Sequence, residues 1–175
     1  FVHLIPFLTD RGVDPMVAAG AMGTMVFMQI PGRLLFGWLG DRVRITRLKY
    51  LKMLAIFVEA IGIFILIRAT SLPWVWAFLV VYGIGLGSGI AITPPMRGRY
   101  WGRKAYATIQ GMMLPFTMIA GVIAPVYAGW TYDTTGSYIS AFQVLLIGLL
   151  ISIVVTFFLN PPKPPAKIGK ITEVL

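Results

Sequence analysis

The chain of 175 residues contains no cysteine, a single histidine and six acidic residues. Without cysteine, disulfide bonds, thiolate metal sites and thiol nucleophiles are excluded. One histidine and six acids also leave little material for an enzyme, because catalysis and metal binding draw on paired acids or on clusters of histidine and carboxylate. We therefore expect neither enzymatic activity nor a cofactor or metal ion.

Charged residues are also scarce, at 12% of the chain, whereas 58% of the residues are hydrophobic and the mean hydropathy is +0.83. Soluble domains have roughly 45–50% apolar and about 25% charged residues, so this composition indicates a membrane protein whose main partner is the lipid bilayer. The net charge of +9 can indicate nucleic-acid binding. Here lysine and arginine lie in short clusters between apolar runs, which membrane topology explains and a nucleic-acid partner does not.

The apolar runs predict an all-α, polytopic membrane protein, because a helix needs about 20 residues to cross the hydrocarbon core. The first run is too short to cross, so we expect the chain to begin inside a helix. Five full spans follow it, and residues 161–175 form a proline-rich tail. The expected spans are approximately 1–9, 16–40, 49–69, 74–96, 105–130 and 139–159.

Glycine and proline mark special positions within these spans. Glycines at 83, 85, 87 and 89 form two interleaved G-x-x-x-G pairs, which favour close helix packing, with a flexible hinge as the alternative. Pro94 and Pro95 are expected to end or bend their span. Asp14 is expected to cap the helix that begins at Pro15.

The positions of lysine and arginine predict the orientation of the chain. Basic residues are concentrated in loops 41–52 and 97–104 and in the tail, whereas the opposite loops offer only Arg11 and Arg68. The positive-inside rule therefore places the two basic loops and the tail in the cytoplasm. We expect an integral protein of a plasma membrane or a bacterial inner membrane.

Three stretches resemble the major facilitator superfamily of transporters. The run from Gly32 to Arg47, GRLLFGWLGDRVRITR, matches its G-x-L-x-x-G-x-L-x-D-R loop signature at Gly32, Arg33, Gly37, Gly40, Asp41 and Arg42. The second basic loop, RGRYWGRK, and the stretch from Gly121 to Tyr138 resemble the oxalate/formate antiporter and monocarboxylate transporter branch. The stretch from Gly121 to Tyr138 follows the pattern G-x-x-x-P-x-x-x-G-W-x-x-D-x-x-G-S-Y.

This resemblance implies that residues 1–160 form the second six-helix half of a twelve-helix transporter, with a truncated first helix and five full spans. The N-terminal half of the transporter is then the partner of this chain. The implied function is transport of a small organic anion, a mono- or dicarboxylate, by alternating access, with exchange and proton symport both open. The alternatives are a membrane sensor or assembly subunit on the same scaffold, or a facilitator for another class of solute.

Arg33 is the first candidate for substrate binding. It lies eight residues before Asp41, which places it about 12 Å along the helix from the loop. A charge at that depth costs about 2.5–3.5 kcal/mol unless it has a partner or faces a cavity. The arginine fork suits a carboxylate, and the resembling branch binds substrate with an arginine on this helix. That branch has an acid one turn earlier, where this chain has Gln29, which is itself a candidate for substrate binding. A structural ion pair or snorkelling to the surface is the alternative.

Further polar residues are weaker candidates. Glu59 lies at a depth similar to that of Arg33, so it either pairs with Arg33 or takes part in proton coupling. His3, about 10 Å inside the external face, either contacts substrate or is a packing residue. Tyr82 is a further substrate-binding candidate, as are Tyr106, Gln110 and Tyr127.

Asp41 and Arg42 are candidates for a gate. A carboxylate at the membrane surface can interact with the positive N-terminus of a helix in the opposing half. Such a contact would form in only one transport state. The alternative is a solvated loop acid that balances the neighbouring arginines.

Overall fold

A computed structural model describes residues 4–10, 12–102 and 104–161. Within these ranges the chain is helical and has no strand, which confirms the predicted all-α fold. A short 3-10 helix, η1, joins the second and third α-helices. The elements are α1 (Leu4–Thr9), α2 (Pro15–Arg42), η1 (Ile45–Arg47), α3 (Leu48–Arg68), α4 (Leu72–Trp101), α5 (Tyr106–Thr135) and α6 (Ile139–Phe158).

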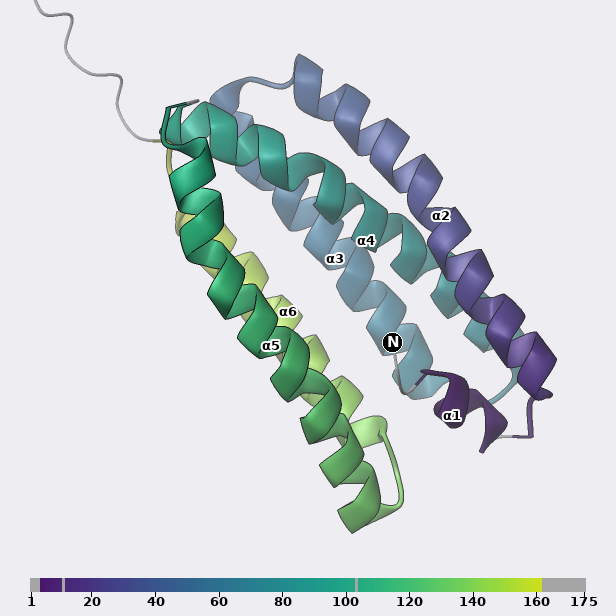
Figure 1. The fold of residues 1–175 in the computed structure, drawn as a ribbon. Helices are drawn as coiled ribbons and strands as arrows, with labels where there is room; N and C mark the ends of the chain where they lie inside the picture. The colour runs from purple at the N-terminus through teal and green to yellow at the C-terminus, as the bar shows by residue number, and fades with distance from the viewer. Residues whose placement is uncertain (1–3, 11, 103, 162–175) are drawn as a thin grey trace, which may run out of the picture.

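The helix α4 is the central element of the bundle (Figure 1). It lies between α2 and α3 and packs along both of them, while α2 and α3 hardly contact each other. On its other side α3 packs against α6, whereas α5 makes few contacts with any other helix, α6 included. Any two groups that face each other across the bundle from α2 and α3 are therefore separated by α4.

Four elements of the described chain are long and apolar enough to cross a membrane: the η1–α3 segment (residues 45–68), α4, α5 and α6. The helix α2 has 28 residues, which is sufficient length, but it is not among the four. Its small residues, together with Gln29 and Arg33, lower the hydropathy of the helix. Polar residues of this kind are tolerated in a span that faces protein or a water-filled cavity.

The start of α2 follows the predicted capping pattern. Asp14 Oδ1 accepts hydrogen bonds from the backbone amides of Met16 at 2.8 Å and Val17 at 3.3 Å, and Pro15 occupies the first helical turn. The carboxylate satisfies amides that have no partner within the helix. The sequence therefore located this helix start correctly.

The two G-x-x-x-G pairs of α4 face different neighbours. A Cβ on Gly83 would lie 2.7 Å from the carbonyl oxygen of Met25 in α2, and one on Gly87 would overlap the backbone of Gln29. A Cβ on Gly85 would instead lie 2.6 Å from the backbone nitrogen of Glu59 in α3. The prediction of close helix packing is confirmed, because only glycine leaves room for the neighbouring backbones.

Two helices extend further than the sequence suggested. The α4 helix continues through Pro94 and Pro95 to Trp101, so the expectation that these prolines end it is wrong. Leaving the helix within an apolar bundle would expose many backbone groups, whereas each proline removes only one donor. The helix α5 continues to Thr135 and ends at Gly136, whose φ of 68° is the left-handed conformation that glycine adopts readily.

Candidate functional site

Arg33 and Gln29 lie one helical turn apart on α2 and form the centre of the candidate site. The guanidinium Nη2 of Arg33 donates a hydrogen bond of 2.9 Å to Gln29 Oε1. The side chain of Gln29 is buried, whereas Arg33 is exposed on this chain. Among the described residues no acid forms an ion pair with Arg33. Its charge is therefore held in place by a neutral amide and has no counter-charge.

The tight crossing of α2 and α4 positions this pair. A Cβ on Gly32, the neighbour of Arg33, would overlap the carbonyl oxygen of Ile84 in α4, and Gly87 contacts the backbone of Gln29. Backbone contacts this close fix the rotation of α2 about its own axis, since no side chain separates the two helices. The side chain of Arg33 is consequently exposed next to the rigid contact between α2 and α4.

Glu59 lies near the charge of Lys52 rather than near that of Arg33. Its Oε1 lies 2.8 Å from the position that a Cβ on Gly89 would occupy, and Lys52 Nζ lies 3.4 Å from the same position. The ends of the two side chains thus lie over the same glycine of α4, although they are not close enough for an ion pair. Lys52 also donates a hydrogen bond of 3.1 Å to Thr93 Oγ1. Pairing of Glu59 with Arg33 is not what the structure shows, because α4 separates the helices that carry them.

The remaining substrate candidates are placed as follows. Tyr82 is buried and lies against Gly62 of α3, away from the α2 side of α4. Gln110 accepts a hydrogen bond from Arg97, which joins α5 to the end of α4. Tyr127 is partly exposed on α5, as is Tyr106 near the start of that helix. His3 lies outside the described residues.

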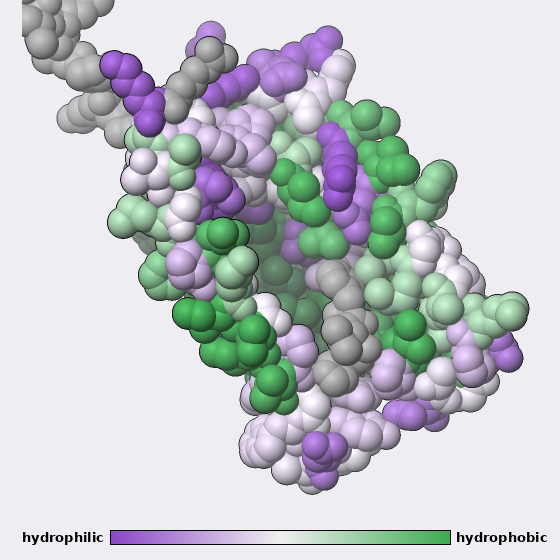
Figure 2. Space-filling view, viewed as in Figure 1, coloured by the Kyte–Doolittle hydropathy of each residue, from purple (hydrophilic) through white to green (hydrophobic). Residues whose placement is uncertain are grey.

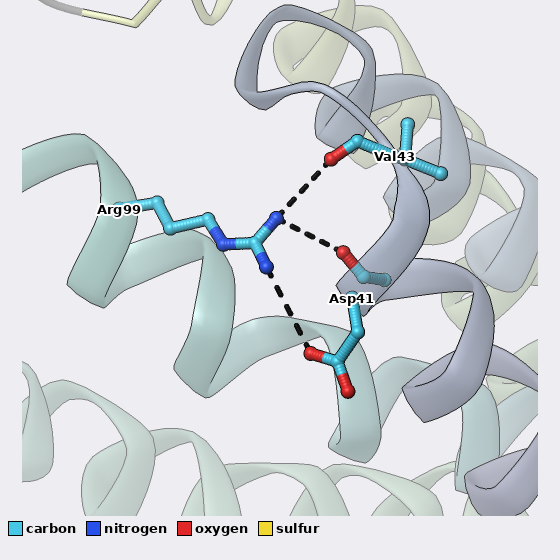
Figure 3. Close-up of polar contacts among 4 residues, drawn as sticks. Asp41, Val43 and Arg99 are labelled. Carbon is cyan, nitrogen blue, oxygen red and sulfur yellow. Dashed lines mark hydrogen bonds and ion pairs between the residues drawn. The ribbon is translucent and has the colours of Figure 1, made fainter.

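Asp41 has a partner within this chain. Its Oδ1 lies 3.8 Å from Nη2 of Arg99, near the end of α4 (Figure 3). Nη1 of Arg99 donates hydrogen bonds of 3.0 Å to the carbonyl of Gly40 and 3.2 Å to that of Val43. One guanidinium therefore binds the C-terminal carbonyls of α2 and its last acid together. Such carbonyls lack partners within a helix and favour a cation.

Arg42, the other candidate for the gate, points elsewhere. Its guanidinium carbon lies 3.8 Å from the centroid of the Trp38 ring, one turn back on α2, in a cation–π contact. Among the described residues it forms no ion pair. The structure thus separates the two gate candidates, with Asp41 facing α4 and Arg42 stacked on its own helix.

The face drawn in Figure 2 is hollowed in its middle, between the surface over α5 and the surface over α2 and α4. Hydrophobic side chains predominate along α5, and no residue in the most apolar stretch of that helix is buried. Much of the apolar surface of the described residues is therefore exposed on this chain. Strongly hydrophilic side chains gather near the end of the bundle that carries the α2–α3 and α4–α5 connections.

Sequence reasoning missed Arg99 and Lys52. Lys52 and Glu59 are seven residues apart, which places them on one face of a helix at 3.6 residues per turn, so their spacing alone was a usable signal. Arg99 could not be paired with Asp41 while the helix was expected to end near Pro95. The contact depends on α4 reaching the same end of the bundle as the α2–α3 connection.

Comparison with known proteins gives consistent matches. The family model described as Major Facilitator Superfamily matches residues 1–174. Monocarboxylate transporter 12-B from Danio rerio is 28% identical over 90% of this chain and 33% of its own length. Monocarboxylate transporter 13 from Bos taurus is 27% identical over 95% of the chain and 40% of its own length. The uncharacterized transporter YycB from Bacillus subtilis (strain 168) is 25% identical over 82% and 36%. The chain spans about a third of the length of these relatives.

Proposed function

The chain belongs to the Major Facilitator Superfamily, and on this premise we propose that it forms the C-terminal half of a secondary transporter for a small organic anion, a mono- or dicarboxylate. Transport proceeds by alternating access, in which two halves rock around a site near the middle of the membrane. The relatives named monocarboxylate transporters support this class of substrate. The N-terminal half of the transporter is the partner that covers the hollowed face.

The observation that carries the proposal is the unpaired charge of Arg33. An arginine has five N–H donors, and Gln29 accepts one hydrogen bond from the guanidinium, which leaves donors for a substrate carboxylate. A planar carboxylate matches two of these donors at once, with charge assistance. The substrate thus supplies the counter-charge that the described residues do not provide to Arg33.

Gln29 bears on how transport is coupled. An amide side chain does not ionise, so the Gln29–Arg33 pair cannot take up and release a proton. Anion exchange, in which one carboxylate replaces another at Arg33, needs no proton at this site. The pair therefore supports exchange over proton symport.

We propose Asp41 and Arg99 as part of the gate. Both lie near the C-terminal ends of α2 and α4, at the membrane surface where the opposing half would approach or withdraw during rocking. The carboxylate of Asp41 is 81% exposed, so it remains available to a helix of that half, while Arg99 fixes the backbone around it. A contact between halves that forms in one state only would stabilise that state.

Uptake by the full-length protein tests the function. Purified protein in liposomes should take up labelled mono- or dicarboxylates, faster when the vesicles contain unlabelled anion, as exchange requires. Arg33→Gln should abolish uptake, and Arg68→Gln, an arginine at the opposite membrane surface, should leave it unchanged. Binding of carboxylates without flux would favour a sensor on the same scaffold, and flux of neutral solutes alone would contradict the substrate class.

Labelling of single cysteines tests the orientation, since this chain has no native cysteine. We propose that Arg44 and Arg99 face the cytoplasm, whereas Asp14, Ser71 and Thr135 face outside. Arg99 donates to the carbonyl of Val43, so the two basic loops lie at one end of the bundle. An impermeant reagent added outside should label position 135 and not position 44, and the reverse pattern would overturn the assignment.

A further inference from the structure

A row of exposed, largely apolar side chains on α3 begins next to an arginine. Tyr50, Leu54, Phe57 and Phe64 follow one another at helical spacing on one face, and each side chain is about half exposed. Arg47 precedes Tyr50 by three residues and lies at the start of the same face. Because the side chains of this face are about half exposed and the face is apolar along its length, it is suited to contact lipid acyl chains.

A second row of exposed apolar side chains lies on α2 and also ends next to an arginine. Leu35 is 51% exposed and Trp38 54% exposed, and the guanidinium of Arg42 stacks on the Trp38 ring at 3.8 Å. Arg42 follows Arg33 by nine residues, which is two and a half turns, so the two arginines point to opposite sides of α2. This row therefore faces away from the proposed substrate site.

Both rows end at the α2–α3 connection, which adds Arg44. The backbone amide of Arg47 donates to the carbonyl of Arg44 at 2.8 Å, and the resulting turn brings these two residues together. Arg99 binds the carbonyl of Val43 and so holds the connection against α4. In the part of the chain that the structure describes, none of the three arginines pairs with an acid, and all three are exposed.

We propose that Arg42, Arg44 and Arg47 bind the phosphate of an anionic phospholipid, whose acyl chains lie along the two apolar rows. Three positive charges without acids favour an anionic headgroup over a zwitterionic one. Trp38 and Tyr50 flank the arginines, and such rings prefer the layer between headgroups and acyl chains. A soluble phosphate would use only the charges, whereas a lipid uses the charges and the rows together. This inference does not depend on the transported solute.

Retention of lipid by the full-length protein tests the site. The protein is purified from vesicles of phosphatidylcholine mixed with phosphatidylglycerol, and the bound lipids are weighed by native mass spectrometry. Wild type should retain phosphatidylglycerol preferentially. The triple variant Arg42→Gln, Arg44→Gln, Arg47→Gln should lose at least about tenfold of this preference, since each arginine near an anionic surface strengthens binding severalfold. Arg68→Gln is the matched control, because Arg68 lies 5.5 Å from the Phe64 ring at the other end of the α3 row.

Three further results complete the test. The triple lysine variant should keep the preference, because it keeps the charges. Arg44→Gln and Arg47→Gln as a pair, which leave the helix packing untouched, should lose part of it even if the triple variant fails to fold. Soluble glycerol phosphate should not displace the lipid. Equal retention of both lipids by wild type, an equal loss in Arg68→Gln, or displacement by glycerol phosphate would each overturn the proposal.

Discussion

The two sides of α4 both pack closely through glycines, but they differ in the charged side chains that lie beside the contact. Toward α2, Gly83 and Gly87 admit a helix whose arginine, Arg33, has only a neutral amide as its partner. Toward α3, Gly85 and Gly89 admit a helix whose two opposite charges, Glu59 and Lys52, lie over the same glycine. Close packing alone therefore does not indicate function. The difference lies in whether the charge beside the contact lies near an opposite charge within the described chain.

Alanine at Gly87 and alanine at Gly89 should show the largest difference in stability between the α2 side and the α3 side of α4. Gly87→Ala places a methyl group against the backbone of Gln29, which cannot move without shifting α2, so we expect a loss of about 1–3 kcal/mol in stability. Gly89→Ala meets only the ends of the Glu59 and Lys52 side chains, which can rotate away, and should cost less. Thermal unfolding in detergent compares the two.

Gly20→Ala is the control for that comparison, because nothing lies within 4 Å of a Cβ at this position of α2. It should leave the unfolding temperature unchanged or raise it, since alanine favours helix. Equal losses in Gly87→Ala and Gly89→Ala would mean that the two sides of α4 are packed alike, contrary to the comparison.

Neutralising Glu59, whose carboxylate lies near Lys52, should have the next largest effect on stability. Glu59→Gln leaves Lys52 with Thr93 alone in an apolar bundle, and we expect a loss of about 1–2 kcal/mol, reduced from that of a fully buried pair by partial exposure. Lys52→Met combined with Glu59→Gln should recover most of this stability. A double variant as unstable as the sum of the single variants would show that the two charges do not interact.

Asp41→Asn should have the smallest effect on stability. The carboxylate is largely exposed and its ion pair with Arg99 is long, so its removal should cost about 0.2–1 kcal/mol. It should instead shift the balance between inward- and outward-facing states of the full-length protein, measured by cysteine accessibility on both faces. Arg99→Gln should shift it further, because the carbonyls of Gly40 and Val43 then lose their donor. Unchanged accessibility in both variants would remove these residues from the gate.

The sequence predicted the features that depend on local chemistry. The helices follow from apolar runs, the start of α2 from Asp14 and Pro15, and the close contacts of α4 from the spacing of its glycines. The similar depth of Arg33 and Glu59 in the membrane suggested that they pair. Depth does not show, however, that another helix lies between the two that carry them. The order α2, α4, α3 is set by packing across the whole bundle, and it directs Glu59 to Lys52.

The same limit applies to the end of α4. The cost of a proline in a helix is known, but the cost of leaving the helix depends on whether the surroundings are water or an apolar bundle. Pro94 is exposed and Pro95 is partly buried, but their neighbours Ile92 and Met96 are buried in the bundle, so α4 continues and brings Arg99 to Asp41. A contact of this kind becomes predictable only when the surroundings of the segment are known.

Carboxylate binding by three variants tests most directly the claim that Arg33 is unpaired because the substrate is its partner. Binding is measured on Arg33→Lys, on Arg33→Gln and on Arg33→Gln combined with Glu59→Gln, with uptake normalised to the amount of protein in the membrane. Lysine keeps the charge without the planar fork, so Arg33→Lys should bind severely less, and both variants with glutamine at position 33 should not bind at all. Recovery of transport in the double variant would show that Arg33 only neutralises Glu59, and would contradict the account.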